Sequence, residues 1–151
     1  MSDVLPPSFH QRIVDDCPEA VIYADAAGYI RYWNAGATRI FGFAQGEAVG
    51  ARLDIIIPER LRERHWEGYD KVMGGVPTRY GEGALLAVPA LHKDGRLISA
   101  EFTILPLRDG TGTLLGIAAF LRDVTVRFEE TRALRQALAT FKGEPAGQHR
   151  S

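Results

Sequence analysis

The chain has 151 residues, 46% of them apolar, which is enough for one ordinary hydrophobic core and short for two. Its 18 basic and 19 acidic side chains are interspersed and leave a net charge of -1, which excludes a general electrostatic footprint for nucleic acid or an anionic membrane. The single cysteine excludes an internal disulfide, no signal peptide is visible, and no apolar run reaches the roughly 18 residues that span a bilayer, so we expect a cytoplasmic protein.

Residues 1–17 are expected to form an N-terminal extension with one short helix. Ser8 is placed to cap that helix, which ends at Asp16 before a proline. Residues 20–24 and 29–33 are β-branched and aromatic runs joined by a glycine-containing loop. This pattern predicts a β-hairpin.

Short helical segments are predicted after the hairpin. Asn34 is expected to cap a helix that Gly42 ends, and residues 45–49 form one more helical turn. Residues 53–57 have the composition of a strand, but their place between two helices and before a proline also fits a short helical turn. Both interpretations stand at this point.

The run from Pro58 to Gly75 predicts one helix of about four turns and carries the main functional candidate. Pro58 suits a helix start, and the glycine pair at the other end supplies a stop. One face of this helix contains Leu61, His65, Tyr69 and Val72 or Met73. The imidazole of His65 is therefore expected to point inward, where its ring nitrogens need partners.

After this helix, apolar residues recur at every second position, as in β-strands. Three strands are predicted at residues 78–91, 96–107 and 114–121, joined by turns that contain aspartate and glycine. Together with the hairpin and the short helices, these strands predict an α+β domain with one antiparallel sheet.

The last predicted helix covers residues 126–142 and has an apolar stripe. The stripe is spaced in threes and fours: Phe128, Thr131, Leu134 or Arg135, Leu138 and Phe141. This spacing is typical of a dimer seam or of a connector to a longer segment, and we expect a homodimer through the terminal helices. A helix folded back on its own sheet is the alternative. Residues 143–151 are expected to be a disordered tail.

Several of these motifs occur in an order that resembles PAS sensor domains. They are Trp33-Asn34 at a helix start, Phe41-Gly42-Phe43, Glu47-Ala48-Val49-Gly50, Lys93-Asp94-Gly95 and Leu121-Arg122-Asp123-Val124-Thr125. The resemblance covers residues 18–125 and implies a five-stranded antiparallel sheet with short helices on one face, between which the family binds small cofactors or ligands. It also implies that residues 126–142 pass a signal to an output domain or partner protein that the sequence does not identify.

A narrower resemblance concerns the predicted central helix. Pro58-Glu59, then Arg64-His65 and a following tyrosine, are similar to the helix of haem-binding PAS domains in rhizobial oxygen-sensor kinases. The run from Arg64 to Tyr69 looks more like the haem PAS domains of carbon-monoxide-responsive transcription regulators. The oxygen sensors place an arginine on the next strand, where this chain has Leu85 and Leu86. An apolar wall lacks a donor for dioxygen, so the resemblance implies carbon monoxide, nitric oxide or redox sensing.

The resemblance implies b-type haem with His65 as the axial iron ligand. Apolar walls are expected from Leu61, Tyr69, Val72, Met73, Leu85, Leu86, Ile104 and Leu105, and Arg79 is the expected partner of a haem propionate. Met73 and His92 are weaker candidates for a sixth ligand. Trp66 is expected to face away from the site and to pack against a terminal helix, and Trp33 to lie in the core or on a dimer surface.

Two other functions remain open on the sequence. A cofactor-free PAS module for dimerisation or protein interaction would use the same scaffold, and a small ligand such as a noncovalent flavin would use the same space. No protease, kinase or nucleophile-elbow motif occurs, so we expect no enzymatic activity.

Overall fold

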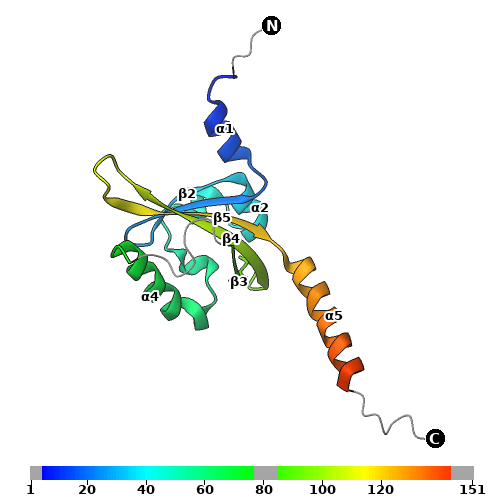
Figure 1. Ribbon diagram of the computed structural model, residues 1–151. Helices are drawn as coiled ribbons and strands as arrows, with labels where there is room; N and C mark the ends of the chain where they lie inside the picture. The colour runs from blue at the N-terminus through cyan, green and yellow to red at the C-terminus, as the bar shows by residue number, and fades with distance from the viewer. Residues whose placement is uncertain (1–4, 77–84, 144–151) are drawn as a thin grey trace, which may run out of the picture.

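The computed structural model describes residues 5–76 and 85–143 and has an α+β fold, with one five-stranded antiparallel sheet and helices on one of its faces (Figure 1). The strand order is β2-β1-β5-β4-β3. In chain order the elements are α1 (Phe9–Asp16), β1 (Ala20–Asp25), β2 (Ile30–Trp33), α2 (Ala35–Phe41), α3 (Gln45–Ala48), η1 (Leu53–Ile56), η2 (Glu59–Leu61), α4 (Arg62–Met73), β3 (Leu86–Leu91), β4 (Leu97–Arg108), β5 (Leu114–Asp123) and α5 (Thr125–Gly143).

The core lies between the sheet and the helices. Strand register places alternate residues on this inner face, as where Ile22 pairs with Ala119 and Ala119 pairs with Ile104. Ile22 and Ala119 pack in one cluster with Ile40 and Phe41 of α2, which are 4% and 0% exposed. The antiparallel sheet with helices on one face, predicted from the sequence, is confirmed.

Asn34 connects three segments at one end of the sheet. Its Oδ1 accepts hydrogen bonds from Ala37 N at 2.9 Å, as a helix cap does, and from Val21 N at 2.8 Å in β1. Its Nδ2 donates to the carbonyls of Val14, Cys17 and Glu19. The predicted cap is present, and the same side chain also binds the N-terminal helix to the domain.

Three local predictions differ from the structure or are settled by it. Ser8 makes no side-chain cap bond and has φ 59°, so it does not cap α1 as predicted. Residues 53–56 form a 3-10 helix, so the helical alternative holds and the strand is wrong. The predicted single helix from Pro58 begins instead as a 3-10 turn, in which Leu61 N donates to the Pro58 carbonyl at 2.8 Å, and α4 follows from Arg62.

The strand predicted at residues 78–91 is described from Leu86, and residues 77–84 lie outside the described part of the chain. Residues 144–151, most of the predicted tail, also lie outside it.

Trp33 is 1% exposed and donates from Nε1 to Thr38 Oγ1 and to the Phe43 carbonyl, which places it in the core.

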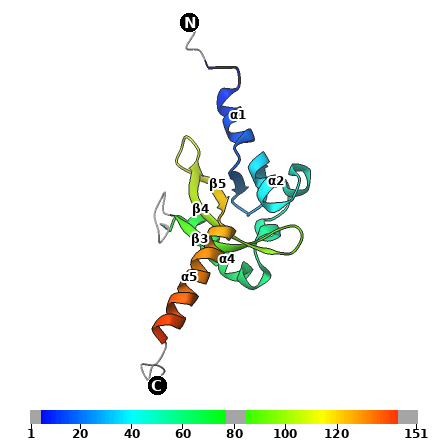
Figure 2. The same cartoon turned by 90° about the vertical axis from the view of Figure 1, so that its right-hand side faces the viewer.

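The terminal helices project from opposite ends of the domain (Figures 1 and 2). From Val126 onward every described residue of α5 is exposed, so this helix does not fold back on its own sheet. Its first turn is fixed to β4, because Ser99 N donates to Thr125 Oγ1 at 3.0 Å and Arg127 forms an ion pair with Glu101.

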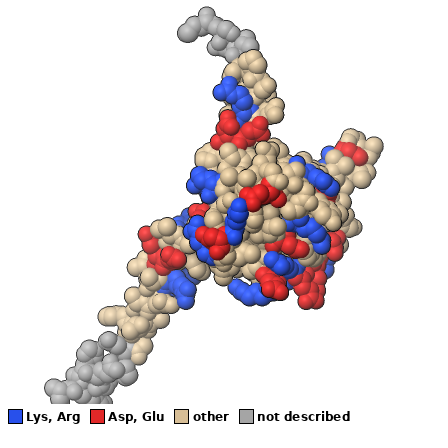
Figure 3. Space-filling view, turned by 180° about the vertical axis from the view of Figure 1, so that it is seen from behind, with Lys and Arg blue, Asp and Glu red and all other residues tan. Residues whose placement is uncertain are grey.

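The surface agrees with the near-neutral composition. On the face seen in Figure 3, acidic and basic side chains are interspersed over the domain, and neither sign forms one large field. Within the described ranges, no helix combines the length and the apolar character that crossing a bilayer requires.

Candidate functional site

α4 is held beside the inner face of the sheet by the segment that precedes it. Arg62 Nε donates to the Ile57 carbonyl at 3.0 Å, which fixes the first turn of the helix to the end of η1. The face predicted to point inward does so: Tyr69 is buried, and Leu61, His65, Val72 and Met73 are partly buried. The exposed positions Glu63, Arg64, Glu67, Asp70 and Lys71 cover the opposite side.

The ring of His65 lies among aromatic side chains. Its centroid is 4.8 Å from that of Trp66 and 5.9 Å from that of Tyr69. Its Nδ1 is buried and has no hydrogen-bond partner among the described residues. Burial lowers the pKa of His65, the Asp54 carboxylate opposes this change, and Arg52 adds to it. A neutral imidazole is the form that binds metals.

Tyr69 anchors the same face of α4 to β1. Its hydroxyl donates to the Asp25 carbonyl at 2.5 Å and to the Ala24 carbonyl at 3.2 Å. Burial raises the pKa of this phenol, with the nearby Asp25 acting in the same direction. Tyr69 therefore stays neutral and fixes the distance between α4 and the sheet one turn after His65.

Trp66 packs against the β1–β2 turn and beside His65 and Tyr69, so the prediction that it faces away from the site and packs against a terminal helix was wrong. Its ring lies against Gly28, where an added Cβ would overlap it, and under the Arg52 guanidinium, 4.1 Å from the ring centroid. Its Nε1 donates to Asp54 Oδ1 at 2.7 Å. The sequence did not indicate Arg52 or Asp54, because both act through a partner on another element.

The structure brings together only part of the predicted apolar wall. Tyr69, Val72, Met73 and Ile104 pack in one cluster with Ala24 and Ile117. Leu86 is partly buried and pairs with Phe102, so it shares the inner face. Leu61 is partly buried in η2, next to the start of α4.

Two predicted wall residues are not in this wall. Leu105 pairs with Ala118, on the opposite face from Ile104, and is 41% exposed, because successive residues of a strand point to opposite faces. Leu85 precedes β3 and is 62% exposed. By contrast Val88, on the same strand face as Leu86, is 40% exposed, so the inner face is less tightly covered at β3 than at β1.

The remaining candidates lie elsewhere or are not described. Arg79, the predicted propionate partner, lies outside the described residues. His92 packs against Gly42 and approaches Asp94 through Nδ1 at 3.1 Å, at the far end of β3. A hollow of about 590 Å³ lies beside the start of α4 between Arg60, Arg62, Leu91 and Leu97, and His65 does not line it. No group of three His, Cys, Asp or Glu side chains suited to a metal ion occurs in the described ranges.

Comparison with known proteins agrees with this architecture. The model of the family described as PAS fold matches residues 14–129. An uncharacterised protein of Azorhizobium caulinodans is 33% identical over 131 residues, which cover 86% of this chain and 17% of that protein. The sensor protein FixL of Bradyrhizobium diazoefficiens is 28% identical over 128 residues, covering 85% of this chain and 25% of that protein.

The chain therefore spans a quarter or less of the length of these two curated relatives. Among solved structures, an RNA-binding Light-Oxygen-Voltage receptor superposes with a TM-score of 0.70 at 21% identity, over 92% of this chain and 40% of that chain. At this level of identity the likeness concerns the fold.

Proposed function

The chain belongs to the PAS-fold family, and from that premise we propose that it is a sensory module of signal transduction that binds b-type haem through His65. Carbon monoxide, nitric oxide or a change of redox state is the proposed signal. An output domain or partner protein carries the response. In this role the module senses a signal and catalyses no reaction.

The buried, unpartnered Nδ1 of His65 is the observation that carries this proposal. A buried polar atom without a partner costs stability, and a bound ligand that supplies the missing partner is one explanation for a site that retains such an atom. The lowered pKa of His65, caused first by burial, keeps the imidazole neutral and able to bind iron. The resemblance of the helix to that of haem-binding PAS domains, and the rhizobial sensor among the relatives, point in the same direction.

Neighbouring residues would hold the ligand in place. Tyr69 ties α4 to β1, and Trp66, through Asp54, ties it to η1. Tyr69, Val72, Met73, Ile104 and Leu86 supply apolar surface for a porphyrin face. Bound haem would supply an iron centre that takes a diatomic gas or an electron, and Arg79 stays the predicted partner of a propionate.

The first test is reconstitution of the full chain with haemin. Wild-type protein should bind one equivalent and give a sharp Soret band. His65→Ala should lose or shift that band, whereas His10→Ala, a change at an exposed histidine of α1, should leave it unchanged. An identical band in wild type and His65→Ala would contradict ligation by His65.

The choice of gas can be tested on the same loaded protein. Leu86 lies on the inner face and offers no hydrogen-bond donor, so Leu86→Arg should raise the affinity for dioxygen relative to carbon monoxide. Leu85→Arg is the matched control, because Leu85 is 62% exposed and lies outside the wall. Equal responses of the two variants would remove Leu86 from the gas site.

A noncovalent flavin is the second candidate, favoured by the shared fold with a Light-Oxygen-Voltage receptor. Equilibration with flavin mononucleotide followed by gel filtration separates the two cofactors. Co-elution of flavin together with failure to retain haemin would replace the first proposal. Retention of neither cofactor would favour a protein-interaction module without one.

A further inference from the structure

Asp54 is a partly buried carboxylate of η1 that holds the ring of Trp66. Trp66 Nε1 donates to Asp54 Oδ1 at 2.7 Å, a short distance that is typical of a hydrogen bond to a charged acceptor. None of the ion pairs within the described residues includes Asp54. The carboxylate therefore binds the indole and is not neutralised by a contacting cation from the described part of the chain.

The Trp66 ring connects this carboxylate to the proposed iron ligand. The ring centroids of Trp66 and His65 lie 4.8 Å apart and the two planes meet at 76°, so the indole packs edge to face against the imidazole. A rotation of the indole would change the space that the imidazole occupies. A hydrogen bond that fixes the indole therefore also limits the orientation of the His65 ring.

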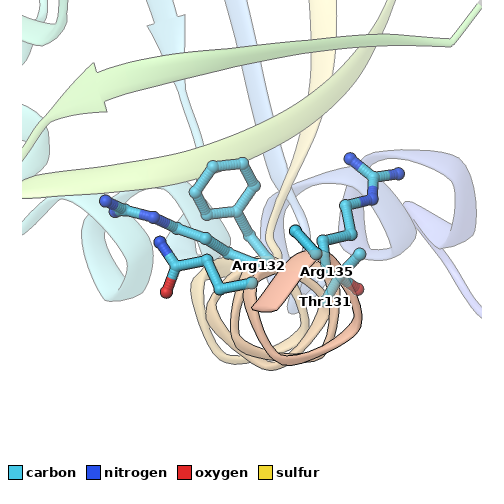
Figure 4. Close-up of a pocket in the computed structure, with 6 residues that line it drawn as sticks. Thr131, Arg132 and Arg135 are labelled. Carbon is cyan, nitrogen blue, oxygen red and sulfur yellow. The ribbon is translucent and has the colours of Figure 1, made fainter. Parts of the chain in front are cut away.

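A positive charge lies over the same indole ring. The Arg52 guanidinium is 4.1 Å from the ring centroid of Trp66 and 5.8 Å from that of Tyr29. By contrast, Arg132 and Arg135 extend to either side of the exposed helix α5, around a surface hollow of about 270 Å³ (Figure 4). Arg52 is thus a cation held against aromatic rings next to the site.

The two charges act on His65 in opposite directions. Burial has the largest effect on the pKa of His65 and lowers it, Asp54 raises this pKa, and Arg52 lowers it. An anion close to an axial histidine stabilises the more positive, oxidised state of a bound metal, and a cation has the opposite effect. The side chains that hold the indole therefore also determine the electrostatic potential at the imidazole.

We propose that Asp54 is a positioning residue for His65 that acts through Trp66, and that Asp54 and Arg52 adjust in opposite directions the preference of the site for ferric over ferrous haem. The positioning role concerns this chain alone, whereas the electrostatic role rests on the proposed function, haem ligation by His65. Asp54 favours the ferric state and Arg52 the ferrous state. Together they would set the potential at which the module responds to a change of redox state.

Hydrogen exchange at the indole N–H groups of the full, cofactor-free chain tests the positioning role. The chain has two tryptophans, and Trp33 is the internal control, because its Nε1 donates to Thr38 and Phe43. Asp54→Ala should accelerate exchange at the Trp66 indole about tenfold and leave Trp33 unchanged. Asp54→Asn keeps an acceptor and should return exchange close to the wild-type rate. Unchanged exchange at Trp66 in Asp54→Ala, or equal acceleration at both tryptophans, would overturn the positioning role.

Redox titration of the haem-loaded chain tests the electrostatic role. Asp54→Asn removes the negative charge but keeps the hydrogen bond, so it should favour ferrous haem about tenfold, a rise in midpoint potential of about 59 mV for a one-electron couple. Arg52→Gln should lower the midpoint potential. Asp70→Asn and Lys71→Gln are the matched controls, because both side chains are exposed on α4, and each should leave the potential unchanged.

The two experiments distinguish failure of this inference from failure of haem binding. Variants of Asp54 and Arg52 that keep a wild-type Soret band but shift the potential no more than the controls, or both in the same direction, would overturn the electrostatic role. If the wild-type chain retains no haem, the proposed function and the electrostatic role fail together. Exchange at the Trp66 indole still decides in that case whether Asp54 positions the ring beside His65.

Discussion

The imidazole of His65 is partly buried beside two aromatic rings, and its Nδ1 has no partner among the described residues. Burial favours the neutral ring, and the Asp54 carboxylate favours the charged one. The net effect is a pKa below the usual value of 6.5. At the scale of one residue, the site is therefore a neutral nitrogen base held in an apolar surrounding.

This lowered pKa predicts how stability depends on pH. His65 binds a proton more readily in the unfolded chain than in the folded one. Its contribution to the free energy of unfolding is therefore complete above the unfolded pKa of 6.5 and is lost as the pH falls below that value. His65→Gln in the cofactor-free protein should therefore lose less unfolding free energy than wild type between about pH 7 and about pH 5. Urea titrations at both pH values measure the difference.

His10→Gln is the control for this experiment, because His10 is exposed on α1. Its pH dependence should match that of wild type. If His65→Gln and His10→Gln gave the same profile as wild type, burial of His65 would not contribute to acid sensitivity.

At the scale of elements, the β1–β2 turn determines where α4 lies. Gly28 has φ 85° and lies against the Trp66 ring, while the hydroxyl of Tyr69 binds the carbonyls at the end of β1. The Arg52 guanidinium lies over the Trp66 ring, 4.1 Å from its centroid. The helix that carries His65 is thus fixed to a turn almost forty residues earlier in the chain, as the positions of Gly28 and Trp66 show.

Gly28→Ala should disrupt the packing of the Trp66 ring against the β1–β2 turn. A Cβ at Gly28 both strains a positive φ and overlaps the Trp66 ring, so the free energy of unfolding should fall by about 3 kcal/mol. Gly50→Ala is the matched control, because Gly50 has φ 94° and open space around it, and should cost about 1 kcal/mol. Urea unfolding and Trp fluorescence measure both; equal losses would mean that Trp66 moves aside without cost.

At the scale of the whole molecule, a packed domain carries two helices that project from opposite ends (Figure 2). α1 is joined to the domain mainly through polar groups: Asn34 binds the carbonyls of Val14 and Cys17, and Tyr32 donates to Asp15. α5 is joined through Thr125 and Arg127 to β4. Both ends are therefore attached by a few specific bonds and leave most of their surface exposed.

Asn34→Ala should destabilise the whole fold. Asn34 is 4% exposed, and its removal leaves Val21 N and Ala37 N without an acceptor and three carbonyls without a donor. The free energy of unfolding should fall by about 3–5 kcal/mol. Asn34→Ser keeps the helix cap and should cost less. A loss below about 1 kcal/mol for Asn34→Ala in thermal and urea unfolding would contradict the role assigned to Asn34.

The sequence alone was sufficient for features that depend on neighbouring residues. The Asn34 cap, the Gly42 stop and the alternation of β4 follow from local backbone chemistry and from a period of two. Ordered along the chain, these signals were enough for an α+β domain with one antiparallel sheet and for the inward face of α4, including His65, whereas the five-stranded sheet was implied by the resemblance to PAS sensor domains.

The tertiary structure decided what depends on contacts distant in sequence. Trp66 meets Gly28 and Asp54 instead of a terminal helix, and Leu105 turns away from the site while Ile104 enters it, because only the docked register of the strands sets which face is inward. Hydrophobic periodicity indicates that a helix or strand has an apolar face. Burial of that face stabilises the fold only when another element covers it, and the tertiary structure determines which element does so.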